Sequence, residues 1–414
     1  MANTNTLHDN LFAPDVISDP YSYFGQLRAE DPVHWNETYK LWLVTRYDDA
    51  NWVTKHPEIF SNAVFQRDPR GPYPPVDESH LGLYQFLKNF FASWLAEVDP
   101  PEHTEMRKVI YEYFTPKAVE RWRPLVRDTI ESLLDKVQVG SEGAMDLLED
   151  FAMPLPVFII GRILGIPEKD QDLVRTLSQK ILLYNRGEAD RMPELVEAIQ
   201  TFQGYLEPLV TERISRPGDD LLSVLAGGEK AGVFSREQVI ANAILLLFAG
   251  HETSMNLTCN GMLAFIRNPR QWELFKQDPA STVKSVTEEC LRFDPPVKSI
   301  QRIATQDVVL RKKTIKRDDR IRYVISSANR DPDKFEEPDR FDINRQGNHH
   351  IAFGAGNHYC VGSTLGRLEG QEAFLALARR FDRFKLDGQE PEYVPGIAFR
   401  SILKLPVRWE TART

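Results

Sequence analysis

One long stretch of helical pattern, residues 235–267, is the strongest constraint on how this 414-residue chain can fold. Ser235 followed by Gln238 fits a capping box at its start, and Asn268-Pro269 ends it. At about 1.5 Å per residue such a helix is roughly 50 Å long. Its central run AILLLFAG is apolar nearly all round, which indicates a helix buried in a large core. The rest of the chain must therefore surround it.

Polar residues interrupt the apolar helix in the run AGHETS, residues 249–254. A glycine inside a helix costs about 1 kcal/mol relative to alanine. Glu252 and Thr253 bring an acid and a hydroxyl into a buried run, where both need partners. The Thr253 hydroxyl can donate to the carbonyl of Ala249, four residues earlier. Taken alone, the pattern equally fits a helix that reaches the surface here.

A second unusual stretch, FGAGNHYCVG, places Cys360 among Gly354, Gly356 and Gly362, directly before a helical pattern. Glycines permit tight turns and close backbone approach. The positive end of a helix favours a negative atom and lowers the pKa of a thiol. Cys360 can therefore serve as a nucleophile, a metal ligand or a redox group, but it also suits a small buried apolar residue in a turn.

The same stretch matches the pattern F-G-x-G-x-H-x-C-x-G and so resembles the haem-binding loop of the cytochrome P450 family. The resemblance makes Cys360 the axial thiolate and metal ligand of a haem b, with electron density pushed towards bound oxygen. It also implies that His358 contacts a haem propionate and that Phe353 shields the thiolate side. Gly354 belongs to the same cofactor-binding loop.

Three further motifs extend the resemblance over most of the chain. His103 and Arg107, four residues apart on one helix face, match two propionate contacts, although such a pair is otherwise typical of a solvated face. Arg302 matches a third. AGHET matches the family element above the haem, which places Ala249 beside the cofactor and makes Thr253 and Glu252 the catalytic pair. These two residues would bind dioxygen and relay protons.

The motif ECLR places Glu289 and Arg292 on one face of a helix at 281–292. Surface pairs at this spacing contribute little to stability. In the family that the chain resembles, the pair is buried and completed by an arginine from a segment such as PDRF, here Arg340. The resemblance therefore predicts a structural triad.

The resemblance also places a set of mostly apolar residues along the walls of a substrate pocket. They are Leu245, Phe248, Ala249, Val297, Ile300, Ala398 and Phe399. A hydrophobic small molecule is therefore the expected substrate, and Phe248 favours a flat or slim one. Lys298 and Arg400 either pair with a substrate carboxylate or face solvent.

Composition and charge argue against several other classes of protein. The net charge of −9 argues against general nucleic-acid binding, and the polar N-terminus lacks the apolar segment of a signal peptide. No run reaches the roughly 18 apolar residues of a membrane span. Three cysteines without CxxC spacing argue against a disulfide framework and suit a reducing compartment. We therefore expect a cytoplasmic protein that binds neither nucleic acid nor membrane.

The expected fold is mainly α with small β sheets, a single cytochrome P450 haem domain over residues 1–414 without a fused reductase. The chain has no GxGxxG motif and too few cysteines for a Cys₄ iron–sulfur cluster. Two electrons must then come from a separate ferredoxin or flavodoxin, supplied by an NAD(P)H-dependent reductase. Lys108 and Arg367 are candidates for contact with that partner.

The remaining patterns predict the other elements. Helices are expected at 20–31, 47–56, 102–114, 118–137, 150–164, 168–184 and 191–215, and strands at 33–36, 41–47, 297–305, 307–310 and 321–326. A hairpin is expected over 395–410, with its tip near the substrate.

The function that these motifs predict is a haem-thiolate monooxygenase that inserts one oxygen atom of O2 into a hydrophobic small organic molecule, by C–H hydroxylation or O-dealkylation. Three alternatives stay open at this point. A peroxide-driven haem-thiolate peroxygenase needs no acid–threonine pair, and a haem-based sensor or binding protein needs no electron donor. A hydrolase with Cys360 as nucleophile would use His358 as its base and leaves AGHET unexplained.

Overall fold

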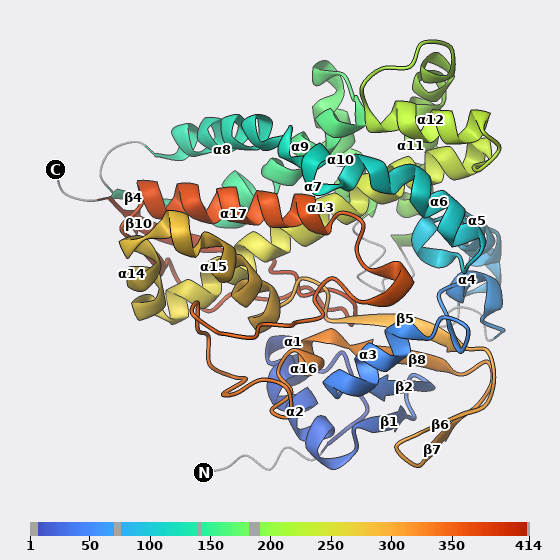
Figure 1. Ribbon diagram of the computed structural model, residues 1–414, viewed down its shortest axis with the longest axis horizontal. Helices are drawn as coiled ribbons and strands as arrows, with labels where there is room; N and C mark the ends of the chain where they lie inside the picture. Colours follow the sequence, from blue (N-terminus) through green and yellow to red (C-terminus); the bar gives the residue numbers. More distant parts are fainter. Residues whose placement is uncertain (1–6, 70–75, 139–141, 182–190, 412–414) are drawn as a thin grey trace.

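The computed structural model describes residues 7–69, 76–138, 142–181 and 191–411. Helices dominate, the largest sheet lies at one end of the molecule, and β4 and β10 lie beside the helical part near the C-terminus, which confirms the predicted fold class (Figure 1). The helices are α1 (Pro14–Ser18), α2 (Pro20–Glu30), α3 (Tyr47–Lys55), α4 (Val64–Arg67), α5 (Leu81–Ala92), α6 (Glu102–Tyr111), α7 (Pro116–Glu120), α8 (Arg123–Val137), α9 (Pro154–Leu164), α10 (Gln171–Ile181), α11 (Met192–Ser215), α12 (Leu221–Lys230), α13 (Arg236–Arg267), α14 (Pro269–Gln277), α15 (Pro279–Phe293), α16 (Ile325–Ala328) and α17 (Ser363–Arg380). A π-helix, η4 (Leu148–Ala152), precedes α9.

The strands form three small sheets. They are β1 (Val33–Asn36), β2 (Leu41–Val44), β3 (Phe60–Ser61), β4 (Glu142–Asp146), β5 (Ser299–Ala304), β6 (Val308–Leu310), β7 (Lys313–Ile315), β8 (Arg320–Val324), β9 (Arg383–Leu386) and β10 (Pro406–Glu410). The largest sheet has the order β1-β2-β8-β5-β3, the second β4-β10-β9, and β6 pairs with β7.

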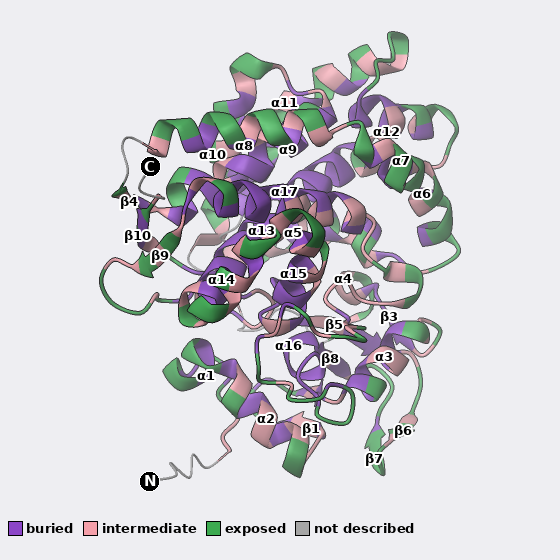
Figure 2. Ribbon diagram, turned by 60° about the vertical axis from the view of Figure 1, so that its left-hand side comes forward, coloured by how far each residue is buried: buried purple, intermediate pink, exposed green. Residues whose placement is uncertain are grey.

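Helix α13 is the centre of the helical part, as its apolar sequence predicts. The capping box is present, because the Ser235 hydroxyl accepts from the Gln238 backbone N–H and the Gln238 side chain accepts from the Ser235 backbone. The helix packs against α9, α11, α12, α15 and α17. Its side chains are buried from Val239 to Phe248 and again from Ser254 to Phe265, within the helical layers of Figure 2.

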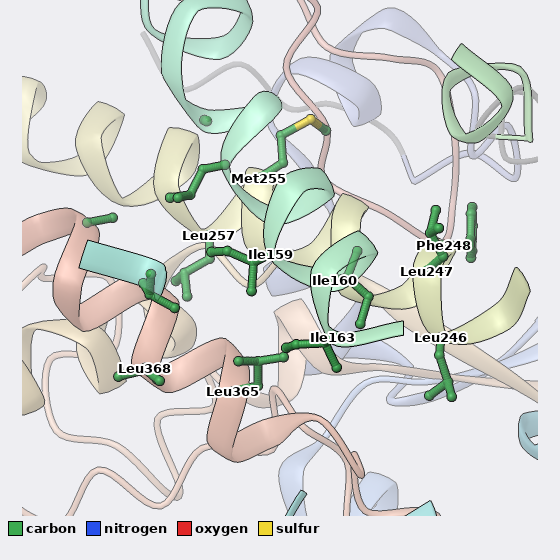
Figure 3. Packing of buried hydrophobic residues seen from close by; sticks show 14 of the residues in the cluster. Ile159, Ile160, Ile163, Leu246, Leu247, Phe248, Met255, Leu257, Leu365 and Leu368 are labelled. Carbon is green, nitrogen blue, oxygen red and sulfur yellow. The ribbon is translucent and has the colours of Figure 1, made fainter. Parts of the chain in front are cut away.

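The contact between α13 and α17 requires a glycine. A Cβ atom at Gly261 of α13 would lie 2.5 Å from the Phe374 ring of α17 and 3.0 Å from the Cys290 sulfur of α15. Figure 3 shows the neighbouring part of this core, where Leu257 and Leu368 lie between the two helices. The glycine lets α17, and with it the loop that carries Cys360, pack close to the central helix.

The helix predictions are mostly confirmed, with ends that shift by a few residues. The segment 118–137 divides into α7 and α8, and 150–164 begins in the π-helix before α9. The helix predicted at 168–184 is α10 as far as Ile181, and the remainder lies outside the described residues. Glu102 begins α6 directly after the Pro100-Pro101 pair.

The predicted hairpin over 395–410 is only partly correct. Tyr393 and Ile402 form an isolated antiparallel bridge, so residues 394–401 form a short turn between them. Residues 406–410, expected as its second strand, are β10 and pair instead with β4 and β9. The return strand was misassigned because the hydrophobic alternation of β10 does not specify which strand it pairs with.

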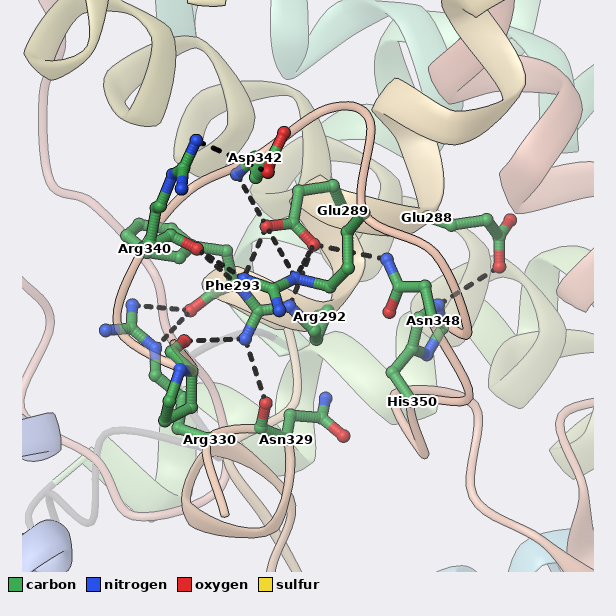
Figure 4. A network of polar contacts seen from close by, with 12 residues as sticks. Glu288, Glu289, Arg292, Phe293, Asn329, Arg330, Arg340, Asp342, Asn348 and His350 are labelled. Carbon is green, nitrogen blue, oxygen red and sulfur yellow. Dashed lines mark hydrogen bonds and ion pairs between the residues drawn. The ribbon is translucent and has the colours of Figure 1, made fainter. Parts of the chain in front are cut away.

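A buried polar network holds the segment that leads to the Cys360 loop (Figure 4). Glu289 and Arg292 are both fully buried, and their carboxylate and guanidinium are joined at 2.8 Å. Arg292 also donates to the carbonyls of Asn329 and Pro338. The Asn329 side chain in turn accepts from the Ile351 backbone N–H. The network therefore connects α15, α16 and the chain just before the loop.

The third member of the triad is Arg345, so the prediction of Arg340 is wrong. Arg345 Nε lies 3.2 Å from the Glu289 carboxylate, and its side chain is 9% exposed. The Arg340 side chain is 55% exposed and pairs with Glu337 and Asp342 instead. Only the backbone carbonyl of Arg340 joins the network, where it accepts from Arg292 and Arg345.

The two arginines give a matched test of this correction. We expect Arg345→Ala to lower the free energy of unfolding by about 3 kcal/mol, because it leaves part of the buried Glu289 charge uncompensated. Arg340→Ala should change it by less than about 0.5 kcal/mol, since exposed pairs contribute little. Urea unfolding followed by tryptophan fluorescence measures both. Equal effects of the two variants would contradict the assignment.

Candidate active site

The Cys360 loop is a compact turn built on the N-terminal side of α17. The Cys360 backbone N–H donates to the Phe353 carbonyl at 2.9 Å, which closes the loop. Gly354 and Gly356 have φ values of 70° and 68°. A Cβ atom at Gly356 would lie 2.4 Å from the Thr54 carbonyl oxygen of α3. Gly356 is therefore required both by its left-handed backbone and by the close approach of α3.

Burial dominates the environment of the Cys360 thiol. It raises the pKa of Cys360 above its usual value, while the Gly362 backbone N–H and the charges of Arg107 and Arg367 lower it by less. The sequence-based expectation that this loop lowers the pKa of the thiol is therefore wrong for the protein alone. A coordinated metal ion removes the thiol proton outright, so burial does not prevent thiolate ligation.

Two histidines and two arginines form a cluster next to the loop, in agreement with their proposed common contact. The rings of His103 and His358 stack with centroids 3.8 Å apart. Desolvation lowers the pKa of His103 to about 4 and that of His358 to about 2, so both are neutral near pH 7. Both ring nitrogens of His103 and Nε2 of His358 are buried without a partner among the described residues. Arg107 and Arg302 form no ion pair with any residue that the structure describes.

The acid of the AGHET element, Glu252, is buried. The alternative interpretation, a helix that reaches the surface here, is therefore wrong for this residue. Glu252 is 4% exposed, and the Ser401 hydroxyl lies 3.2 Å from its carboxylate. The Thr253 hydroxyl donates to the Ala249 carbonyl at 2.7 Å, as expected. Along an otherwise buried helix, Ala249, Gly250 and Thr253 form an accessible strip.

The predicted wall residues come from α13, the start of β5 and the C-terminal turn. Val297 and Phe399 pair as an isolated β-bridge. The Phe248 ring lies 6.2 Å from that of Phe399 in an edge-on arrangement. The other predicted wall residues lie on the same elements, Leu245 on α13, Ile300 in β5 and Ala398 beside Phe399.

Trp94 extends this aromatic row and was not among the predicted site residues. Its ring lies 5.7 Å from that of Phe248. Asn242 of α13 holds the backbone on both sides of Trp94, because its side chain accepts from the Leu95 N–H at 2.7 Å and donates to the Ser93 carbonyl at 3.0 Å. The sequence shows Trp94 only as one of many aromatics, since the clamp depends on residues about 150 positions apart.

Lys298 and Arg400 are both buried, so the expectation that they face solvent is wrong, while contact with a substrate carboxylate stays a prediction. The Lys298 ammonium binds the Gly396 carbonyl. Arg400 donates to the carbonyls of Ile17 at 2.5 Å and Ser18 at 2.9 Å, in the last residues of α1. Arg400 Nε also lies 3.4 Å from the Asp294 carboxylate, so backbone carbonyls and an internal acid compensate these two buried groups. Both side chains support the wall from behind.

Comparison with known proteins decides the family. The cytochrome P450 family model matches residues 281–408. Cytochrome P450 monooxygenase PikC of Streptomyces venezuelae is 34% identical, with 96% of this chain and 93% of PikC covered. The chain belongs to the cytochrome P450 family.

Two further similarities agree with this assignment to cytochrome P450. The 6-deoxyerythronolide B hydroxylase of Saccharopolyspora erythraea is 33% identical, over 95% of this chain and 98% of the hydroxylase. The crystal structure of P450BioI in complex with acyl carrier protein ligated to hexadec-9Z-enoic acid superposes with a TM-score of 0.85 at 29% identity, covering 96% of this chain and 99% of that one. The protein is thus an enzyme of the cytochrome P450 monooxygenase class, and the family implies a haem-thiolate cofactor.

The residues of this P450 fit that cofactor. Haem carries two carboxylates, and the cluster described above offers two arginines that form no ion pair among the described residues and two histidines with ring nitrogens unpartnered there. Cys360 supplies the thiolate that the family requires. Among the described helices, none is long and apolar enough to cross a membrane.

The buried amine of Lys298 predicts how stability depends on pH. Desolvation lowers its pKa from the ordinary 10.5 to about 7 in the folded P450. Between about pH 7 and pH 10 the unfolded chain therefore holds a proton that the folded protein has lost, and the stability conferred by this group rises with pH. We expect Lys298→Met to flatten this rise in urea unfolding midpoints. The exposed Lys117→Met serves as the control and should keep the wild-type slope.

Proposed function

We propose that this P450 inserts one oxygen atom of O2 into a hydrophobic small organic substrate, by C–H hydroxylation or O-dealkylation. The observation that carries the proposal is the pairing of two sites in one fold. The Cys360 loop with its histidine–arginine cluster provides for the cofactor, and α13 presents an accessible strip with an acid and a hydroxyl next to it. The haem, when bound, supplies the iron that activates dioxygen.

The residues around Cys360 hold and orient the cofactor in this proposal. Cys360 provides the thiolate ligand, and Phe353 covers the loop on the side where Arg367 stacks 4.4 Å above its ring. Neutral imidazoles of His103 and His358 donate hydrogen bonds to the propionates. The guanidinium groups of Arg107 and Arg302, together with Gly354 and Ala249, complete the cofactor-binding set named from the sequence.

Thr253 and Glu252, both on α13, transfer protons in this proposal. A buried carboxylate next to a hydroxyl can accept a proton from solvent and release it towards the reacting oxygen. Burial around them excludes bulk water and so limits unproductive loss of oxygen as peroxide. The Thr253 hydroxyl donates to the Ala249 carbonyl, which leaves its oxygen able to accept a hydrogen bond from a proton donor in the site.

The pocket walls favour an apolar substrate of slim shape. Phe248, Phe399 and Trp94 form a row of aromatic rings, with centroids 5.7 and 6.2 Å apart along it. Such rings bury apolar surface and leave few polar groups to bind. A relative named for hydroxylation and a neighbour solved with a hexadecenoic acid on a carrier protein support this class of substrate.

Electrons come, in this proposal, from a separate ferredoxin or flavodoxin and ultimately from NAD(P)H. Arg367, one of the two docking candidates, is half-buried and pairs with Glu288 at 2.7 Å, which weakens its charge as a contact for the donor. Lys108 on α6 remains exposed, as does Tyr359 directly before Cys360. These two side chains offer a cationic and an aromatic contact for the donor protein.

We expect Cys360 to be the iron ligand. Reduced wild-type protein under carbon monoxide should show the Soret band typical of a thiolate ligand, and Cys360→Ala should abolish that band. Cys290→Ala, which removes a thiol from the core, should keep it. A band unchanged in Cys360→Ala would contradict the ligand assignment, and a protein that cannot be loaded with haem would contradict the proposed function.

Removal of the Thr253 hydroxyl distinguishes a monooxygenase from a peroxygenase and from a sensor. Thr253→Ala should divert most of the NAD(P)H-derived electrons into hydrogen peroxide and lower product yield by about 100-fold, the scale of acid–base catalysis. Thr258→Val removes a buried hydroxyl from another face of the same helix. This control should retain the coupling of NAD(P)H consumption to product formation. Full activity of Thr253→Ala with hydrogen peroxide alone would favour a peroxygenase. A wild-type protein that binds haem but turns over with no electron donor would favour a sensor.

A further inference from the structure

A cavity of about 100 Å³ lies between α13, the π-helix η4 and the C-terminal turn. Glu252 and Ser401 line its inner part, and both are buried. Glu149 and Leu403, which are exposed, line its outer part. The cavity therefore extends from the protein surface to the carboxylate of the AGHET motif.

The inner end of the cavity is polar and ordered. Asn256 Nδ2 donates to the Ser401 hydroxyl oxygen at 2.9 Å. Because that oxygen accepts from the amide, its own proton is directed to the Glu252 carboxylate, 3.2 Å away. Asn256 Oδ1 is buried and has no partner among the described residues. A buried acceptor of this kind is a common partner of an ordered water.

The size of the cavity permits a chain of waters. A single water needs about 10–15 Å³ of such space and two to four polar partners. Glu149 at the rim, Ser401 in the wall and Glu252 at the inner end supply polar atoms along its length. Apolar residues such as Met255 and Ile402 fill the wall between them and keep the chain of waters narrow.

We propose that Ser401 is a positioning residue for Glu252 and that this cavity conducts protons from solvent at Glu149 to the Glu252 carboxylate. The proposal rests on the proposed monooxygenase function. A proton from bulk water moves along the waters to the Ser401 hydroxyl as that hydroxyl passes its own proton to Glu252. Each oxygen ends with the number of protons it began with, and Glu252 gains the one that it then delivers towards Thr253.

Two variants of nearly equal shape test the role of the hydroxyl. Ser401→Thr keeps it, and Ser401→Val replaces it with a methyl group. We expect Ser401→Val to lower the product formed per NAD(P)H consumed by about tenfold, since a hydrogen bond to a charged group is worth roughly one power of ten. The solvent deuterium isotope effect should rise in parallel. Ser401→Thr should stay within about twofold of wild type.

A second readout needs no turnover. The infrared band of the Glu252 carboxyl, identified by its loss in Glu252→Gln, should shift in the resting Ser401→Val protein and keep its position in Ser401→Thr. Equal haem content and carbonmonoxy spectra in the two variants show that the fold is intact. If Ser401→Val does not fold, Leu403→Trp at the exposed rim narrows the mouth, and it should raise the isotope effect without moving the band.

The outcomes distinguish this inference from the function on which it rests. A wild-type protein without a thiolate-type carbonmonoxy band or without product overturns the proposed function itself. Coupled turnover in wild type, with Ser401→Val and Ser401→Thr alike in both coupling and infrared band, overturns the role of Ser401 alone. A shifted band with unchanged coupling and isotope effect shows a purely structural hydrogen bond and likewise overturns the proton route.

Discussion

The burial of α13 is the constraint on which the rest of the structure depends. A helix of 32 residues with apolar side chains on every face is stable only when other elements cover it on all sides. Helices α9, α11, α12, α15 and α17 provide that cover. Because the cover is nearly complete, the acid of the AGHET run, Glu252, is buried inside the protein. The position of the Glu252–Thr253 pair is thus a direct consequence of how the core is built.

The second requirement is a loop that keeps a thiol buried while the chain changes direction. Gly356 packs on α3, the Glu289–Arg292–Arg345 network holds the chain before the loop, and α17 follows it. Each anchor comes from a different part of the sequence. The thiol is therefore positioned by tertiary structure, and its raised pKa shows that the protein alone favours the neutral form. Ligation to iron is what makes a thiolate stable there.

Features that depend on local sequence were predicted well. The capping box at Ser235 and the long apolar run specify α13 without reference to the rest of the chain, and the fixed residue types around Cys360 made that loop recognisable. Arg345 was missed because two arginines five residues apart in an irregular segment look alike until the path of the backbone decides which reaches Glu289.

The supporting side of the pocket was harder to foresee. Basic residues normally seek water or an anion, but Lys298 and Arg400 bind backbone carbonyls that only the folded chain brings together. Asn242 and Ser401 contact segments roughly 150 positions away in the sequence, and no periodicity indicates such pairings. The roles of these side chains depend on long-range contacts, which a single sequence does not contain.

The hydrogen bonds of Arg400 connect the two ends of the polypeptide. Its guanidinium donates to the carbonyls of Ile17 and Ser18, while its neighbour Phe399 belongs to the predicted substrate wall. The end of α1, at Ile17 and Ser18, thus supports the predicted pocket wall, although it lies far from that wall in sequence. Loss of these two carbonyls would leave the Asp294 carboxylate, 3.4 Å from Arg400 Nε, to compensate this buried cation behind the predicted wall. A change near Ile17 or Ser18 would therefore act on the predicted wall through Arg400, without altering the wall residues themselves.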